Sequence, residues 1–148
     1  MTQFKIASGT WADFTEDAKF IREQVFIQEQ NIVPEDEWDA QDAIALHFML
    51  YAENQPIATA RLLQNNSIGR VAVLKAYRGK GIGKLLMLNI MQQAQKQQRE
   101  FLKLSAQVYA IPFYAALGFV VQGEEYLDCG IPHVDMYMQD LAGFKPDL

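Results

Sequence analysis

The strongest constraint on the fold is a change of hydrophobic period across the glycine-rich segment 78–83. Before it, residues 68–74 form a short apolar run typical of a β-strand. After it, apolar residues recur at the spacing of one helix face, at Ile82, Leu85, Leu86, Ile90 and Ala94. A second apolar run follows at 101–106. A strand, a tight turn, a helix and a strand in this order predict a βαβ unit with two parallel strands.

The rest of the chain predicts a mixed α/β (α+β) arrangement. Asp13 and Glu16 resemble a capping box at the start of the first helix, whose apolar residues recur at helical spacing. Polar hairpin signals between three apolar runs predict an antiparallel meander. The expected elements are a helix at 13–28, an acidic loop at 31–42, strands at 47–52, 57–63 and 68–74, a short helix at 111–117 and a last strand at 134–138.

Length, charge and cysteine content narrow the class of protein. The chain has 148 residues, of which 13 are basic and 18 acidic, so its net charge is −5. We expect one domain over residues 1–148 and no nucleic-acid partner, because an acidic chain repels phosphate backbones. The single cysteine, Cys129, favours a reducing compartment. No stretch approaches the ~18 apolar residues of a membrane span, so we expect a cytoplasmic protein without membrane attachment.

The segment 78–83 has the composition of an anion site. Its glycines allow successive backbone N–H groups to turn toward one point, at the positive end of the helix that follows. Arg78, Lys80 and Lys84 add mobile cations, which favours a phosphate or pyrophosphate ligand. A dinucleotide fingerprint fails because Lys84 occupies the place of its third glycine, and a Walker loop fails because Leu85 replaces its Ser or Thr.

The motif Arg-x-x-Gly-x-Gly at 78–83 resembles the acetyl-CoA loop of the GNAT N-acetyltransferase superfamily. A second motif, Phe-Tyr-x-x-x-Gly-Phe at 113–119, resembles the later signature of that family and follows in the expected order. Similarity to the small bacterial ElaA-like branch extends over nearly the whole chain. The resemblance implies a mostly antiparallel central sheet with helices on both faces, and acetyl-CoA as co-substrate.

The resemblance also implies where the coenzyme would bind. Backbone N–H groups of Gly79, Lys80, Gly81, Ile82 and Gly83 would take the pyrophosphate, beside Arg78 and Lys84. The strand Val71-Ala72-Val73 would pair with pantetheine, and a backbone N–H beside a bulge there would polarise the thioester carbonyl. Tyr114 would protonate the departing thiolate, as the catalytic acid. Gln107 stands where many relatives carry asparagine, so its bond to the coenzyme stays open.

The sequence leaves the catalytic base open. Glu29, at the end of the first helix, is the first candidate; the others are the acidic residues at 35–39, His47 and His133. The acidic run surrounds Trp38. It is interpreted either as a solvated loop or as a site that attracts a cationic amine. Two distant histidines predict no metal site, and Cys129 reads as an incidental small residue.

Three functions follow from these patterns. The first is direct acetyl transfer from acetyl-CoA to a primary amine of a small molecule or peptide in a ternary complex. The alternative is a non-catalytic module that binds or senses acyl-CoA, and the retention of Tyr114 disfavours it. A third interpretation rests on a similarity to acyl-homoserine-lactone synthases in the Arg-x-x-Val-Phe pattern at 22–26. Pairing with a second copy into a homodimer stays open.

Overall fold

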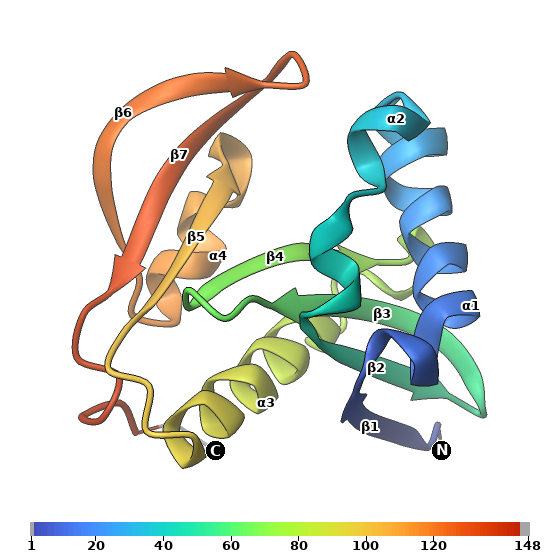
Figure 1. Ribbon diagram of the computed structural model, residues 1–148, viewed down its shortest axis with the longest axis horizontal. Coiled ribbons are helices and arrows are strands. Elements are labelled where there is room, and N and C mark those ends of the chain that lie inside the picture. Colours follow the sequence, from blue (N-terminus) through green and yellow to red (C-terminus); the bar gives the residue numbers. More distant parts are fainter. Residues whose placement is uncertain (1, 146–148) are drawn as a thin grey trace.

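The computed structural model describes residues 2–145, which contain one seven-stranded mixed sheet (Figure 1). Its strands lie side by side in the order β1-β2-β3-β4-β5-β7-β6. All neighbours are antiparallel except β4 and β5, as expected for a meander followed by a βαβ unit. The strands are β1 (Phe4–Gly9), β2 (Leu46–Ala52), β3 (Gln55–Leu62), β4 (Ser67–Val73), β5 (Leu102–Gln107), β6 (Val120–Asp128) and β7 (Ile131–Met138).

Helices cover both faces of the sheet, and each face has its own apolar core. On β2, Phe48 and Leu50 belong to the core beneath α3 (Ile82–Lys96) and α4 (Ile111–Ala116). The intervening Met49 belongs to the core beneath α1 (Trp11–Arg22) and the π-helix η1 (Glu23–Glu29). This alternation follows from the two-residue period of a strand. The predicted fold class, a mostly antiparallel sheet between two helical layers, is therefore confirmed.

The parallel strands β4 and β5 separate almost as soon as they meet. They pair only at Ser67 with Lys103 and at Ile68 with Leu104. Beyond these pairs the strands diverge, and Figure 1 shows β5, β7 and β6 leaning away from the β1–β4 half of the sheet. Residues 69–73 of β4 consequently have no strand partner on the β5 side. The backbone hydrogen-bonding groups on that edge are left for another partner.

The first helix begins two residues earlier than predicted. Thr10 is its N-cap, and the Asp13 side chain accepts hydrogen bonds from the Thr10 N–H and hydroxyl at 2.9 and 3.1 Å. Asp13 is thus the third helical residue of the capping box, and the predicted pairing of Asp13 with Glu16 was wrong. The predicted single helix also changes character, because residues 23–29 form a π-helix, the wider turn often found near functional sites.

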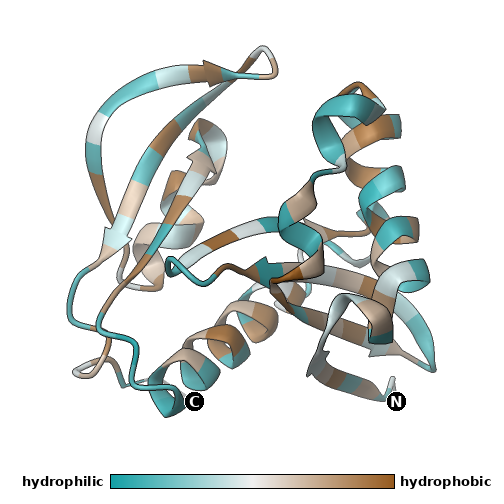
Figure 2. Cartoon of the chain, viewed as in Figure 1, coloured by the Kyte–Doolittle hydropathy of each residue, from teal (hydrophilic) through white to brown (hydrophobic). Residues whose placement is uncertain are grey.

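The sequence analysis missed two edge strands and four short helical segments. β6 buries none of its nine residues, so it lacks the alternation that identifies a strand (Figure 2). β1 buries no residue fully either. The acidic loop contains α2 (Pro34–Glu37) and the 3₁₀ turn η2 (Ala40–Ala43). Two further 3₁₀ turns, η3 (Lys75–Tyr77) and η4 (Val108–Ala110), precede α3 and α4.

Candidate functional site

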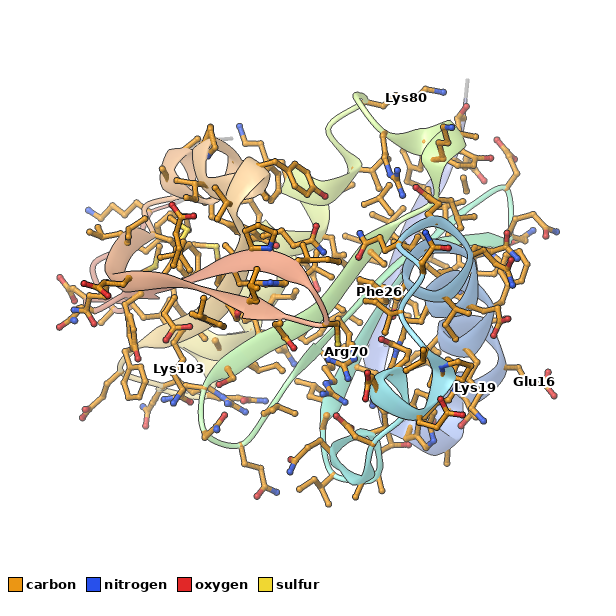
Figure 3. The ribbon with its side chains drawn as sticks, turned by 90° about the horizontal axis from the view of Figure 1, so that it is seen from above. Glu16, Lys19, Phe26, Arg70, Lys80 and Lys103 are labelled. Carbon is orange, nitrogen blue, oxygen red and sulfur yellow. The ribbon has the colours of Figure 1, made fainter. Side chains whose placement is uncertain are left out.

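A cleft of about 720 Å³ opens where β4 and β5 separate. Its wall includes residues of β4, the N-terminus of α3, α4, the end of β5, the β6–β7 hairpin and α2. In Figure 3 the hairpin lies on one side and α1 on the other, with Phe26 and Arg70 labelled between them and Lys80 at the far loop. The molecule therefore offers one continuous cleft from the glycine loop to the hairpin.

The glycine loop presents unpaired backbone donors to this cleft. Gly79 and Gly81 have φ angles of +75° and +78°, in the left-handed region that glycine adopts freely. Gly81 is the N-cap of α3, and no side chain caps that helix. Among residues 2–145, the N–H groups of residues 79–84 find no acceptor. Together with the helix dipole, these donors make a site for an anion.

The exposed edge of β4 carries a bulge. Thr59 of β3 is paired with Ala72, but Arg61 is paired with Gly69, so β4 has one extra residue in this stretch. Within the bulge Arg70 has a φ of +51°, a left-handed conformation that is strained for a residue with a side chain. The bulge lies within residues 69–73, which have no strand partner on the β5 side. The same residues line the cleft.

Tyr114 of α4 contributes a protonated hydroxyl to the cleft. Its side chain is buried, with edge-to-face contacts to Phe113 at 5.0 Å and Phe119 at 6.2 Å between ring centroids. Burial raises the pKa of the phenol, and the nearby Tyr109 adds to the effect. Within the described chain the hydroxyl makes no hydrogen bond. A phenol kept protonated in this way is suited to donating a proton rather than accepting one.

The comparison with protein families identifies the family to which the chain belongs. Residues 12–139 match the model of the acetyltransferase (GNAT) domain. The chain belongs to the GNAT acetyltransferase family. It is 36% identical to the uncharacterized N-acetyltransferase YjcF of Bacillus subtilis, over 81% of this chain and 89% of that protein.

Solved structures agree with this assignment. An acyl-CoA N-acyltransferase from Pseudomonas aeruginosa superposes with a TM-score of 0.81 and 32% identity, covering 91% of this chain and 99% of that one. Escherichia coli ElaA superposes with a TM-score of 0.82 and 26% identity, covering 90% and 98%. The resemblance to GNAT proteins that the two motifs indicated is therefore confirmed.

Most of the residues expected to bind coenzyme in this GNAT domain come together in the cleft. They are Val71, Ala72, Val73, Arg78, Gly79, Gly81, Ile82, Gly83, Lys84, Gln107 and Tyr114. Lys80 does not line the cleft, and its ammonium lies over the Tyr77 ring at 5.4 Å. Gly83 contributes by its small size, because a Cβ there would meet the Phe113 ring at 3.3 Å. Gln107 donates to the Gln30 side chain at 2.9 Å, a link across the cleft that the sequence did not indicate.

Arg78 and Glu29 are bound to each other, which the sequence analysis did not foresee. The guanidinium donates two hydrogen bonds to the carboxylate at 2.8 and 2.7 Å, and a third to the Val73 carbonyl at 2.9 Å. The arginine lowers the pKa of the Glu29 carboxyl, mainly through these hydrogen bonds. A carboxylate stabilised in this way is a weak proton acceptor, and Glu29 does not line the cleft. The geometry argues against Glu29 as the base and against Arg78 as a mobile cation.

Three carboxylates of the acidic segment are paired with arginines of the chain itself. Arg22 is 1% exposed and binds Glu37 at 2.7 Å and Asp42 at 2.8 Å. Arg61 binds Asp39 at 2.7 Å and Asp42 at 3.0 Å. The two expected roles, a solvated loop and an attraction for a cationic amine, were therefore wrong for the buried Glu37 and Asp42, whereas Asp39 is paired but 35% exposed. The three carboxylates form an ionic network that fixes α2 and η2 to α1 and β3.

Arg70 and Trp38 complete this network. Arg70 donates to the Glu37 carbonyl at 2.9 Å, so the network also holds the residue at the β4 bulge. The Arg22 guanidinium lies 5.0 Å and the Lys19 ammonium 5.5 Å from the centroid of the Trp38 ring. The cations that contact this ring therefore come from the chain itself. Sequence reasoning missed the arginine partners because they lie on three separate elements. The only available signal was an excess of acids with no apolar pattern.

The two histidines have different environments. His47 on β2 is buried, donates a hydrogen bond from Nε2 to the Asp42 carbonyl at 2.9 Å, and contacts the Trp11 ring at 4.9 Å. Burial lowers its pKa, and it does not line the cleft. His133 on β7 does line the cleft. Cys129 is exposed at the β6–β7 turn, where burial and nearby carboxylates raise its pKa, so the thiol is a poor nucleophile.

Two further observations concern the described residues 2–145. None of their helices has the length and apolar character of a membrane span. They bring together no group of three or more His, Cys, Asp or Glu side chains that could hold a metal ion.

Proposed function

We propose that this GNAT protein transfers the acetyl group of acetyl-CoA to a primary amine of a small molecule or a peptide, by direct attack in a ternary complex. One observation supports this most: a single cleft joins the free N–H groups of residues 79–84, the unpaired edge of β4 and the Tyr114 hydroxyl. The anionic end, the extended amide-bearing arm and the thioester of acetyl-CoA would meet these complementary groups in that order.

The cleft residues fit the coenzyme by their chemistry. Backbone N–H groups at 79–84 would bind the pyrophosphate, with Lys84 as a nearby cation. The unpaired backbone of Val71 and Val73 would hydrogen-bond the pantetheine amides as a strand does. Arg78, fixed by Glu29, would act as a positioning residue that holds the loop against the end of β4. Gln107 would exchange its bond to Gln30 for one to the coenzyme.

The reaction needs few groups from the protein. Bound acetyl-CoA supplies an activated acyl carbon, and the protein orients the amine toward it. An N–H group at the β4 bulge would stabilise the developing oxyanion, an interaction commonly worth about 3 kcal/mol. Tyr114 would donate its proton to the departing thiolate. We further propose that the reaction takes place in the cytoplasm. Sedimentation of the purified protein tests whether two copies pair through the exposed β6 edge.

Thiol release tests the proposal. The purified protein is incubated with acetyl-CoA and a panel of primary amines that includes ethylamine, peptides with a free N-terminus and S-adenosylmethionine, and free coenzyme A is measured. We expect amine-dependent release. Tyr114→Phe, which keeps the ring packing, should lower kcat by about 10²-fold with little change in acetyl-CoA affinity.

Three outcomes would contradict parts of this proposal. Tight acetyl-CoA binding without transfer to any amine would favour the non-catalytic module. Transfer to S-adenosylmethionine alone would favour the lactone-synthase interpretation. An unchanged kcat in Tyr114→Phe would remove the acid role from Tyr114.

A further inference from the structure

The cleft has a polar floor on the half of the sheet formed by β5, β7 and β6. The Cα partners Gln107, His133 and Tyr126 lie in one row across these three strands. Directly opposed residues of antiparallel strands place their side chains on the same face. Gln107 reaches across the cleft to Gln30 of the opposite half, so this face looks toward the space between the two halves of the sheet.

His133 is held in this row by two contacts. Its side chain is 8% exposed, and its ring stacks on Tyr126 with a centroid distance of 6.2 Å and an interplanar angle of 22°. Tyr126 is fixed in turn, since its hydroxyl donates to Asp135 at 2.6 Å and is hydrogen-bonded to Ser105. Nδ1 of His133 lies 2.7 Å from the Ile131 carbonyl. The imidazole is therefore a fixed group.

The contact with Ile131 determines which ring nitrogen carries the proton. A carbonyl oxygen only accepts hydrogen bonds, so Nδ1 must be the N–H in the neutral ring. The lone pair of the neutral ring then resides on Nε2. Among residues 2–145, Nε2 of His133 has no hydrogen-bond partner, and the residue lines the cleft. In His47 the Nε2 atom is occupied by the Asp42 carbonyl.

The other candidates for the base are less suited. Glu29 is bound by Arg78 outside the cleft, and Glu37 is bound by Arg22 and Arg70 at 2.7 and 3.2 Å. Asp36 and Asp128 line the cleft as carboxylates. The charged or titratable groups that share this part of the cleft or lie beside His133 are Tyr126, Asp128 and Cys129 of the hairpin, Asp135 of β7, Tyr109 of η4, Asp36 and Glu37 of α2, and Arg70 of β4.

We propose that His133 is the catalytic base of the transfer, accepting the proton of the acceptor amine on Nε2. This role rests on the function proposed above. As the amine nitrogen forms its bond to the acyl carbon, one N–H proton passes to Nε2. The C–S bond then breaks with its electron pair on sulfur, and the thiolate takes a proton from Tyr114. Proton transfer from the imidazolium to the phenolate through water restores both groups and leaves an amide and free coenzyme A.

Two amines of matched size test this role. Ethylamine and methoxyamine both have a primary amino group on a two-atom chain. Methoxyamine is weakly basic, so its N–H becomes acidic enough during attack to lose a proton to water. Ethylamine needs a base. The variant His133→Asn keeps a donor for the Ile131 carbonyl and removes the lone pair of Nε2. Glu124→Gln, on the same hairpin and exposed, is the matched control.

We expect His133→Asn to lower kcat with ethylamine by about 10²-fold or more and kcat with methoxyamine by less than about 10-fold. Acetyl-CoA affinity of this variant should stay within about twofold of the wild type. Glu124→Gln should match the wild type.

Three results would overturn the role of His133. Equal losses with both amines would indicate a structural effect, and equal activity of His133→Asn and wild type would exclude the base role. A loss of kcat with ethylamine but not with methoxyamine in Asp36→Asn or Asp128→Asn, and not in His133→Asn, would assign the base to that carboxylate. Absence of transfer by the wild type to any amine would instead contradict the proposed function, and with it this role.

Discussion

Two charge-rich segments line the same cleft and differ in what they leave unpaired. The segment 34–42 contains five carboxylates, and three of them, Glu37, Asp39 and Asp42, are paired with arginines. The loop 78–84 contains three cations, but its backbone N–H groups have no acceptor among residues 2–145. The first segment stabilises the fold, and the second is available to a ligand. Charge density alone did not distinguish them; the state of the hydrogen-bonding groups did.

The largest effect should come from breaking the acidic network. Arg22→Met removes a buried guanidinium and leaves Glu37 and Asp42 short of a partner. The loss of one member of a buried ion pair commonly costs about 3–5 kcal/mol. We expect urea denaturation to show a loss of this size. Acetyl-CoA affinity of the folded fraction should stay within about threefold of wild type, and a selective loss of affinity at unchanged stability would contradict the division between the two segments.

Acidification should also weaken this network, with a smaller loss of stability than Arg22→Met causes. Hydrogen bonds from Arg61 lower the pKa of Asp39 from 3.8 to about 2. Because the folded-state pKa is the lower one, this contribution to stability is complete above pH 3.8 and is lost as the pH falls toward 2. Asp39 is 35% exposed, so solvent screening limits the effect to roughly 1 kcal/mol. Asp39→Asn should flatten the stability profile over this interval, and an unchanged slope in the variant would contradict the assignment.

The smallest effect should come from Glu29→Gln. Glu29 and Arg78 are 33% and 41% exposed, and such pairs contribute about 0–1 kcal/mol. We expect unchanged stability, a change in acetyl-CoA KM below about fivefold and little change in kcat. A catalytic base would instead lose about 10²–10⁴-fold in kcat. Steady-state kinetics with ethylamine separates the two results, and a drop of the larger size would return the base to Glu29.

Features set by local sequence were predictable. The period change across residues 78–83 predicted the βαβ unit. The spacing of Gly79, Gly81 and Gly83 predicted the unpaired backbone N–H groups at the start of α3, because such donors depend on neighbouring residues alone. The partner of Glu29 lies 49 positions away in the chain, at Arg78. Such pairs depend on the tertiary arrangement, and no periodic pattern in a single sequence indicates them. The same holds for the contacts of His133, which follow from the register of three strands.

The central claim is that the free N–H groups of the glycine loop bind the pyrophosphate of the coenzyme. Calorimetric titration of the wild type, Gly81→Asp and Gly81→Asn with acetyl-CoA tests it most directly. Both variants tolerate a left-handed φ to a similar degree, and only Asp adds a negative charge at the loop. S-acetylpantetheine, which has no pyrophosphate, serves as the matched ligand.

We predict that Gly81→Asp binds acetyl-CoA at least about 10²-fold more weakly than wild type, equivalent to about 2.7 kcal/mol. Gly81→Asn should lose less than about 10-fold, and S-acetylpantetheine should bind all three proteins alike. Unchanged acetyl-CoA affinity in a folded Gly81→Asp protein would show that the loop is only a turn, and would contradict the assignment of the coenzyme site.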